Sequence, residues 1–241
     1  MTVPVASDVS RIGLAERICE APPSWAQNRL AGIGRQQLAT LEPFVVHCAW
    51  TERGSVSLGR VVGVTRAHLA GWSWLEILRR RGGADLERLD GHPGLYAGAR
   101  RKRGIAFLTL DRQRWWIEQG VGRAVAARFA LHYQGIDRVD GIGRTCWTLD
   151  WEAWRLCQVL EVLCREQAPN TVVYPHCSLL TEALGDGWGE QRYFLSLAVR
   201  EAEERAPRLL SVQEAQEWTM ELRARRSRLF RWRPELRRAI A

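Results

Sequence analysis

The spacing of apolar and polar positions predicts a chain that mixes helices with short strands. Helical spacing and cap residues predict helices over residues 8–20, 65–81, 111–129, 150–167, 189–205 and from 211 onward. Aliphatic segments bounded by turn signals predict strands over residues 44–51, 58–65, 104–110, 144–149 and 171–174, with a turn at 52–55 between the first two. This mixed order predicts an α+β fold with a helical C-terminal third.

Polar caps define most of the expected helix ends. Thr65 is the expected cap of the helix that the glycine pair at 82–83 terminates. Asp150 is the expected cap of the helix that follows the strand at 144–149. Ser211, followed by Glu214, forms a capping box that predicts the start of the last helix.

The helix expected after Asp111 contains two glycines, Gly120 and Gly122. Its apolar side is formed by residues four apart, namely Ile117, Val121, Val125 and Phe129. Each glycine inside a helix costs about 1 kcal/mol relative to alanine. A break between two helices, or a glycine loop entering a strand, therefore stays open at this point.

The length of 241 residues fits one large domain or two small ones. The change from mixed elements to expected helices falls near residue 185. We therefore expect an α+β domain over residues 1–184 and a helical C-terminal subdomain with a basic tail over 185–241.

Charge changes this picture by pointing to a polyanionic partner. The formal net charge is +8, and all but one of the 35 cationic residues are arginine, Lys102 being the exception. Codon bias in a GC-rich genome accounts for most of the arginine-to-lysine ratio, but it does not explain the placement. Residues 97–144 and 221–241 each carry a net charge of +6, while the remainder sums to −4. Two basic zones on an acidic body favour binding to nucleic acid.

Arginine and tryptophan occur together in the first basic zone. Guanidinium groups bind phosphate with two parallel hydrogen bonds, and indole faces stack on bases. The cluster at 100–103 and the residues that follow the strand at 104–110 form the candidate platform, with Trp115 as a base-stacking residue. The predicted nucleic-acid contacts are Arg100, Arg101, Lys102, Arg103, Arg112, Arg114, Trp115, Arg123, Arg144, Arg223, Arg225, Arg226, Arg228, Arg231 and Arg233.

A glycine–aliphatic–glycine–arginine tetrapeptide occurs three times, at residues 32–35, 120–123 and 141–144. Glycines let backbone amides approach a phosphate, and the arginine that follows could hold it. Tight turns followed by solvated arginines are the alternative reading. Over residues 119–133, the second copy resembles the glycine-rich loop of CRISPR repeat-processing endoribonucleases, in which Gln-Gly-Ile-Gly-Arg precedes further glycines. Ala127 and Arg128 stand here where the resemblance calls for those glycines.

Metal and cofactor chemistry receive little support. The dipeptides at 47–48 and 176–177 each pair a histidine with a cysteine, but neighbours in a strand point to opposite faces and cannot easily share one ion. We expect neither a metal nor a cofactor. The N-terminal residues show no secretion signal, and no segment approaches the roughly 20 apolar residues of a membrane span. The expectation is a cytoplasmic protein without a membrane partner.

Three functions remain open. The leading interpretation is a nucleic-acid-binding protein, with RNA or single-stranded nucleic acid favoured, that acts with other protein subunits in a prokaryotic nucleoprotein complex. The second is a metal-independent endoribonuclease, as the resemblance implies, for which His132, His92 and Tyr133 are the catalytic candidates. The third is an adaptor that docks onto acidic proteins through basic helices.

Overall fold

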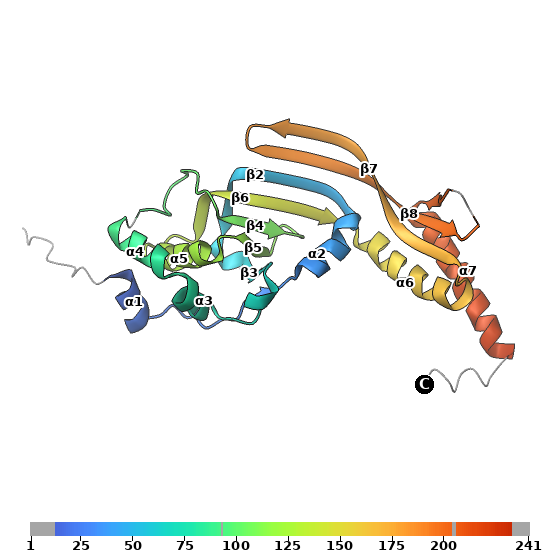
Figure 1. Cartoon of the computed structure of the whole chain (residues 1–241), viewed down its shortest axis with the longest axis horizontal. Coiled ribbons are helices and arrows are strands. Elements are labelled where there is room, and N and C mark those ends of the chain that lie inside the picture. Colours follow the sequence, from blue (N-terminus) through green and yellow to red (C-terminus); the bar gives the residue numbers. More distant parts are fainter. Residues whose placement is uncertain (1–12, 93, 204–205, 233–241) are drawn as a thin grey trace, which may run out of the picture. The chain divides into compact units, whose positions relative to one another are not determined.

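The computed structural model of the chain describes residues 13–92, 94–203 and 206–232, and it has an α+β fold as expected (Figure 1). The helices in these ranges are α1 (Leu14–Glu20), α2 (Arg35–Leu41), α3 (Trp74–Arg81), α4 (Gly83–Gly91), α5 (Val121–His132), α6 (Trp151–Gln167) and α7 (Val212–Trp232). The strands are β1 (Ala31–Gly32), β2 (Val45–Ser57), β3 (Val61–Val64), β4 (Ala106–Thr109), β5 (Trp115–Gln119), β6 (Arg138–Leu149), β7 (Thr171–Gly185), β8 (Trp188–Glu201) and β9 (Arg208–Leu210).

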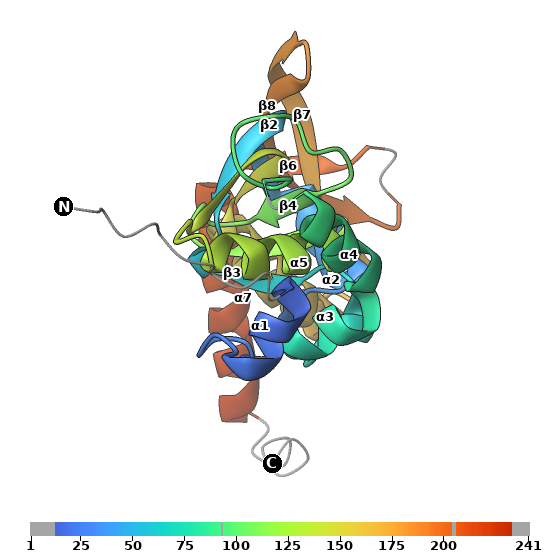
Figure 2. The same ribbon diagram turned by 90° about the vertical axis from the view of Figure 1, so that its left-hand side faces the viewer.

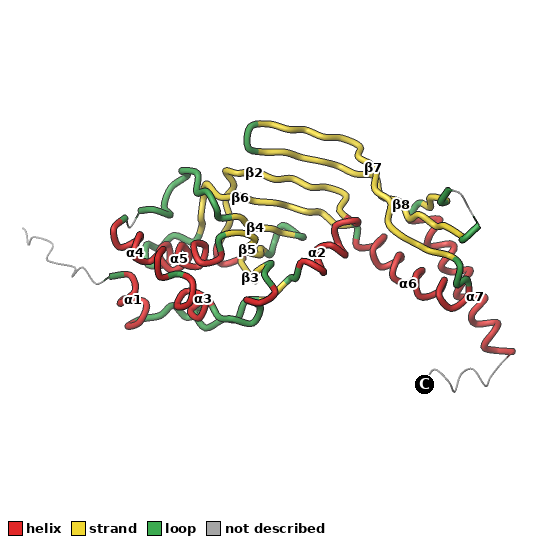
Figure 3. Tube along the Cα trace, viewed as in Figure 1, coloured by secondary structure: helices red, strands yellow, loops and turns green. Residues whose placement is uncertain are grey.

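The strands form one mixed sheet in the order β1-β3-β5-β4-β6-β2-β8-β7, and β9 pairs with β8 (Figure 3). Neighbouring strands are parallel in the pairs β1–β3, β3–β5 and β4–β6, whereas β4–β5 and β8–β9 are antiparallel. The chain divides into two compact units. The first contains residues 1–37, 49–146 and 185–189, and the second contains 38–48, 147–184 and 190–241. These interleaved units differ from the expected division at residues 184 and 185.

The first unit builds its core between the short strands and a group of helices. Helix α5 packs against α3 and α4, and α1 packs against α4 (Figure 2). Phe107, Ile117, Phe129 and Ile142 are almost fully buried in this core. Arg128 is also buried, with its guanidinium carbon 4.1 Å from the ring centre of Trp25 and 3.9 Å from that of Trp74. Burial lowers the pKa of Arg128 to about 10, so it stays charged between the two indoles at neutral pH.

In the second unit, α6 packs against α7, and α7 also contacts β9. The expected cap of α6 is confirmed, because a carboxylate oxygen of Asp150 accepts from the amide of Ala153 at 2.9 Å. The capping box of α7 is also confirmed. The Ser211 hydroxyl accepts from the Glu214 amide at 3.2 Å, and the Ser211 amide donates to Glu214 Oε2 at 2.8 Å.

The prediction of a helix over residues 189–205 is wrong, since residues 189–201 belong to β8. Residues 195–199 are buried there, and the Ser196 hydroxyl donates to the carbonyl oxygen of His176 on β7 at 3.4 Å. Its partner β7 runs through residue 185 rather than ending at 174. Pairing between two long strands therefore overrides the local composition, and α7 is the one helix among the described residues after 185.

Two further boundaries in the first unit differ from expectation. The turn predicted at residues 52–55 lies inside the continuous strand β2, where Gly54 lets the side chain of Arg144 on β6 approach closely. The predicted helix at 65–81 shortens to α3, because Ser73 rather than Thr65 caps it. The Ser73 amide donates to Glu76 Oε2 at 2.6 Å, and the Ser73 hydroxyl accepts from the Glu76 amide at 3.2 Å.

The helix expected after Asp111 is also wrong in its first half. A carboxylate oxygen of Asp111 accepts from the amides of Gln113 at 2.9 Å and Arg114 at 2.8 Å, which makes a turn. Strand β5 follows that turn, and α5 begins only after Gly120, which is left-handed at φ 66°. The glycine thus joins a strand to a helix, because its left-handed backbone ends one element and starts the other.

Candidate nucleic-acid interface

The cationic loop, residues 99–104 between α4 and β4, is held by its backbone against the start of β6. The Lys102 amide donates to the carbonyl oxygen of Gly141 at 2.5 Å. The Lys102 ammonium donates to the carbonyl oxygens of Gly98 at 2.7 Å, Arg100 at 3.2 Å and Asp140 at 2.7 Å. Burial lowers the pKa of Lys102 against the opposing charge of Asp140. All three ammonium protons are engaged, so Lys102 shapes the loop instead of presenting a cation to a ligand.

Two copies of the glycine–aliphatic–glycine–arginine repeat support the same loop. A Cβ at residue 120 would overlap the carbonyl oxygen of Gly104, and a Cβ at residue 141 would overlap that of Arg100. Both glycines have positive φ, 66° and 70°. The glycines of these copies serve close backbone packing. The first copy lies elsewhere in the unit, where a Cβ at Gly32 would overlap that of Ala70.

Arg123, the last residue of the second repeat, also fastens the cationic loop. Its Nη1 donates to the carbonyl oxygen of Arg103 at 3.1 Å, and its Nε lies 3.9 Å from Oδ1 of Asp85 on α4. The amide of Gly143 in the third repeat donates to the carbonyl oxygen of Ile105 at 2.9 Å. The loop is thereby anchored from α5 and β6, while the side chains of Arg100 and Arg103 remain exposed.

These anchored segments line a pocket of about 840 Å³ within the first unit. The lining residues are Asp85, Arg88, Gly91, His92, Gly94, Leu95, Tyr96, Ala97, Arg100, Arg101, Lys102, Arg103, Ile105 and Arg123. Six of them are cationic, and Asp85 is the one carboxylate among them. The volume lies within the range of pockets that bind small ligands. An anion of nucleotide size would find several guanidinium groups in this pocket.

The pocket joins five of the predicted contact residues with others that the sequence patterns did not single out. Arg100, Arg101, Lys102, Arg103 and Arg123 were predicted and line it together. Arg101 also pairs with Glu52 of β2. Asp85 and Arg88 were missed, because no helix was predicted after the glycine pair at 82–83, whereas α4 begins at Gly83 and brings these two residues, three apart, onto one face.

Tyr96 contributes a neutral hydroxyl to the pocket. The side chain is buried, and burial together with the neighbouring Asp85 carboxylate raises its pKa to about 12. It is therefore protonated at neutral pH and is available as a hydrogen-bond donor rather than as a base.

Four predicted contacts of the first basic zone are not among the residues that line this pocket. Arg114 pairs with Asp111 at 2.9 Å and lies 5.9 Å from the ring centre of Trp116. Arg112 has a left-handed backbone at φ 60°. Arg144 is partly buried, with its guanidinium carbon 5.9 Å from the ring centre of Trp115. Trp115 is 6% exposed in the core, so the expectation that it stacks on a base is wrong.

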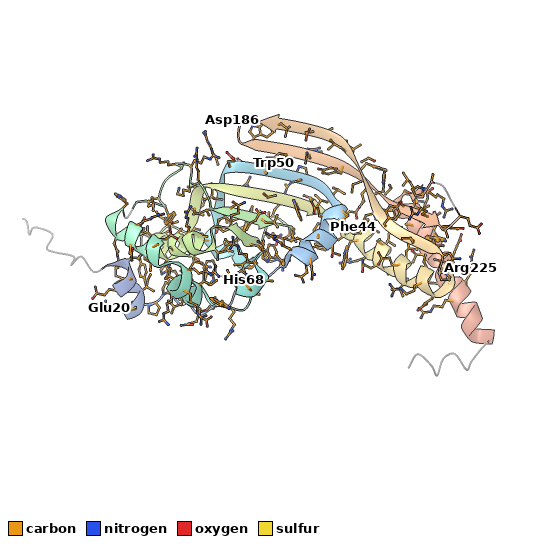
Figure 4. All side chains as sticks on the ribbon, in the orientation of Figure 1. Glu20, Phe44, Trp50, His68, Asp186 and Arg225 are labelled. Atoms are coloured by element: carbon orange, nitrogen blue, oxygen red, sulfur yellow. The ribbon has the colours of Figure 1, made fainter. Side chains whose placement is uncertain are left out.

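The second predicted zone is described only in part. Arg223 and Arg225 are exposed on α7, where Figure 4 labels Arg225. Arg226 forms an ion pair with Glu166 of α6 at 3.3 Å. The side chains of Arg228 and Arg231, and all of Arg233, lie outside the described residues. In the part that is described, these arginines follow one helix and are not among the residues that line the pocket beside the cationic loop.

The three catalytic candidates are not gathered in the pocket. His92 lines it, whereas His132 lies against Trp25, with ring centres 5.6 Å apart. The Tyr133 hydroxyl donates to the carbonyl oxygens of Ala21 at 2.7 Å and Arg17 at 3.3 Å, and burial raises its pKa. Tyr133 therefore anchors α1 to the end of α5, and His92 is the one candidate placed beside the cationic loop.

The two His-Cys dipeptides form polar contacts with other residues of the chain. His47 Nε2 lies 3.0 Å from Glu190 Oε1, and the Cys177 thiol donates to the carbonyl oxygen of Pro43 at 2.9 Å. Across residues 13–92, 94–203 and 206–232, no three histidine, cysteine or acidic side chains are grouped so as to hold a metal ion. None of the helices in these ranges has the length and apolar character needed to cross a membrane.

Comparison with known proteins found no match to any protein-family model, any curated protein or any solved structure.

Proposed function

We propose that the protein binds nucleic acid, RNA or a single strand in preference to a duplex, through the pocket beside the cationic loop. The observation that carries this proposal is that six cations, five of them arginines, line the same pocket with a single carboxylate. Cations on a basic surface are usually scattered, whereas these converge on a volume of about 840 Å³. A concave site of this size suits one or two nucleotides of a flexible strand, while a rigid duplex needs a groove or an extended face.

The anchoring of the cationic loop also supports this function. Arg100 and Arg103 extend from a backbone that Gly141, Asp140 and Arg123 hold through three hydrogen bonds of 2.5 to 3.1 Å. The Lys102 ammonium adds two more within the segment, to the carbonyl oxygens of Gly98 and Arg100. A fixed backbone lowers the conformational entropy lost when phosphate is bound. Guanidinium groups on such a backbone bind phosphate oxygens with a defined geometry.

Further protein subunits are part of this proposal. The outer strand β7 exposes Leu179, Leu180 and Leu184, which are 53%, 62% and 63% accessible. Leu180 and Leu184, four residues apart on this strand, share a face, and exposed apolar side chains on one face are typical of surfaces that contact another protein. In a nucleoprotein complex, the first unit would bind the nucleic acid and the second unit would contact the neighbouring protein subunits.

The test is fluorescence anisotropy with single-stranded RNA, single-stranded DNA and duplex DNA over a series of salt concentrations. The matched variants are Arg100→Gln with Arg103→Gln, in the cationic loop, and Arg60→Gln with Arg79→Gln, at exposed positions of the same unit that do not line the pocket. We expect the loop variant to reduce the logarithmic salt slope by about 1.4, since each phosphate contact on a single strand contributes about 0.7. The control pair should leave the slope nearly unchanged. Salt-independent binding, or equal losses in both variants, would contradict the proposal.

The endoribonuclease is the second candidate, because His92 lies in the same basic pocket. A metal-independent ribonuclease needs a base for the 2′-hydroxyl and cations for the phosphorane, and His92 with the neighbouring arginines supplies those groups. His92→Ala should then abolish cleavage of RNA in the presence of a chelator and preserve binding, while His132→Ala should cut normally. Normal cleavage by His92→Ala, or no cleavage by the wild type, removes this candidate. Affinity for an acidic protein, without strongly salt-dependent binding to RNA or DNA, would instead favour the adaptor.

A further inference from the structure

Asp85 is the feature of the pocket that phosphate binding does not explain. It lies in the first turn of α4, and its side chain is 13% exposed. A carboxylate inside a cationic pocket repels phosphate and weakens the field of its neighbours. An acidic residue in the first turn of a helix does favour the helix dipole, but an exposed carboxylate would do so without the cost of burial.

The carboxylate of Asp85 also keeps hydrogen-bonding capacity. Arg88 Nη1 and Arg123 Nε, its two cationic partners in the described chain, both approach Oδ1 at 3.9 Å, which is beyond hydrogen-bond distance. A buried acceptor normally has a closer donor. The cations next to Asp85 therefore leave its carboxylate oxygens able to accept hydrogen bonds from a ligand.

We infer that Asp85 recognises the base of a bound nucleotide and that guanine is the preferred base, an inference that rests on the proposed nucleic-acid binding. Guanine presents two adjacent donors, N1–H and the N2 amino group, which match the two oxygens of a carboxylate in the same way as a guanidinium fork does. Adenine and cytosine place an acceptor nitrogen beside their amino group, and uracil flanks its single N–H with carbonyl oxygens. Those bases would direct an acceptor toward the carboxylate.

The cations and the carboxylate would then act on different parts of one nucleotide. Arg100 and Arg103, on the cationic loop, would contact phosphate oxygens, while Asp85 accepts from the base. The neutral Tyr96 hydroxyl, whose pKa the Asp85 charge helps to raise, lies in the same lining as a further donor for the guanine carbonyl oxygen. A site built for hydrogen bonds discriminates strongly against a base that lacks the donors, because its polar groups are then left unpaired.

The experiment compares three single-stranded RNA oligonucleotides of about nine residues, the span of one binding site. The first is all uridine, the second carries one central guanosine, and the third carries inosine there, which lacks the N2 amino group. The wild type should bind the guanosine oligonucleotide about tenfold more tightly than the inosine one, in line with a bidentate base contact.

Two variants separate base recognition from charge. Asp85→Asn should lose the preference for guanosine while binding the all-uridine strand more tightly, because it removes the repelling charge. Glu87→Gln, a matched loss of one carboxylate at an exposed position of α4 outside the pocket lining, should keep the preference. Retained all-uridine binding by Asp85→Asn also reports that the variant is folded.

The outcomes distinguish this inference from the function on which it rests. If the wild type binds all three strands equally and with strong salt dependence, guanine recognition is wrong and nucleic-acid binding stands. If Asp85→Asn keeps its preference for guanosine, another group reads the base and the inference is overturned. If the wild type binds none of the strands, both proposals fail together.

Discussion

The cationic loop of the first unit and helix α7 of the second carry the same kind of side chain on different supports. In the loop, the backbone between residues 99 and 104 is held by hydrogen bonds from β6 and α5, and its arginines share a pocket with Arg88 and Arg123. On α7, Arg223 and Arg225 are exposed along one helix, and Arg226 pairs with Glu166. The two basic zones therefore carry the same net charge in the sequence, but the arginines of the cationic loop share one pocket, whereas those of α7 are spread along a helix.

This difference determines what each region can recognise. Convergent cations on a fixed backbone can select a ligand by geometry, because several contacts form at once with little ordering cost. Arginines spread along a helix attract any polyanion by long-range electrostatics, and salt screens that attraction over about 10 Å. We expect the loop to determine specificity and α7 to add affinity that depends on ionic strength.

The largest expected effect is the loss of RNA affinity when the arginines of the cationic loop, rather than those of α7, are replaced. Arg100→Gln with Arg103→Gln should weaken binding of a single-stranded RNA on the order of a hundredfold at physiological salt, since each hydrogen bond from a charged group contributes about 1.5 kcal/mol or more. Arg223→Gln with Arg225→Gln should weaken it less than tenfold. Equilibrium anisotropy on both double variants measures the contrast, and a larger loss from the α7 pair would reverse the roles assigned to the two regions.

The next effect tests whether the loop depends on its glycine support. Gly141→Ala should lower the free energy of unfolding by about 3 kcal/mol, combining a left-handed backbone penalty of roughly 1–2 kcal/mol with an overlap against the Arg100 carbonyl. Gly135→Ala is the matched control, because Gly135 has the same φ of 70° and open space around it.

Chemical denaturation of these two glycine variants gives the difference, and RNA binding by Gly141→Ala should fall more than binding by Gly135→Ala. Equal destabilisation by the two substitutions would mean that the loop can shift without cost, and the fixed-backbone argument would then fail.

The smallest expected effect is on the melting temperature, and it concerns the capping boxes of α3 in the first unit and α7 in the second. Hydrogen bonds from Ser73 lower the pKa of Glu76, and hydrogen bonds from Ser211 lower that of Glu214. A carboxylate whose folded pKa is depressed stabilises the fold above its unfolded pKa, and this contribution is lost as pH falls through the folded value. Glu76→Gln and Glu214→Gln should each lower the melting temperature slightly at pH 7.

Below about pH 4, near the ordinary pKa of glutamate, the difference between each variant and the wild type should shrink. Glutamine preserves the capping hydrogen bonds, so the loss reports charge alone. Thermal melts from pH 7 to pH 3 follow this trend. A destabilisation that grows at low pH would contradict the assigned pKa direction.

Sequence patterns within a few residues predicted a helix start correctly where a single capping residue determines it. Asp150 caps α6, and Ser211 with Glu214 caps α7, as their side-chain oxygens require. The strand at β4 was equally readable from its run of aliphatic residues. The segment over 189–205 was misread, because its pairing with β7 is a long-range contact that periodicity within one segment does not reveal.

The residues of the candidate site were likewise predictable from the sequence only in part. The cluster at 100–103 and the repeated glycine–arginine motifs were visible as patterns, and the structure brings two of the three repeats to that cluster. Trp115 was misassigned because an aromatic residue beside arginines looks the same in sequence whether it is buried or exposed.

The sequence alone determined the charge of this protein, its α+β character and the residues able to cap its helices, because each depends on composition or on contacts a few residues apart. Only the tertiary structure decided which cations meet. Lys102 is used within the loop, Arg123 reaches it from α5, and Asp85 enters the pocket from α4. These contacts join residues far apart in the chain, and their placement follows from packing of the core rather than from any local pattern.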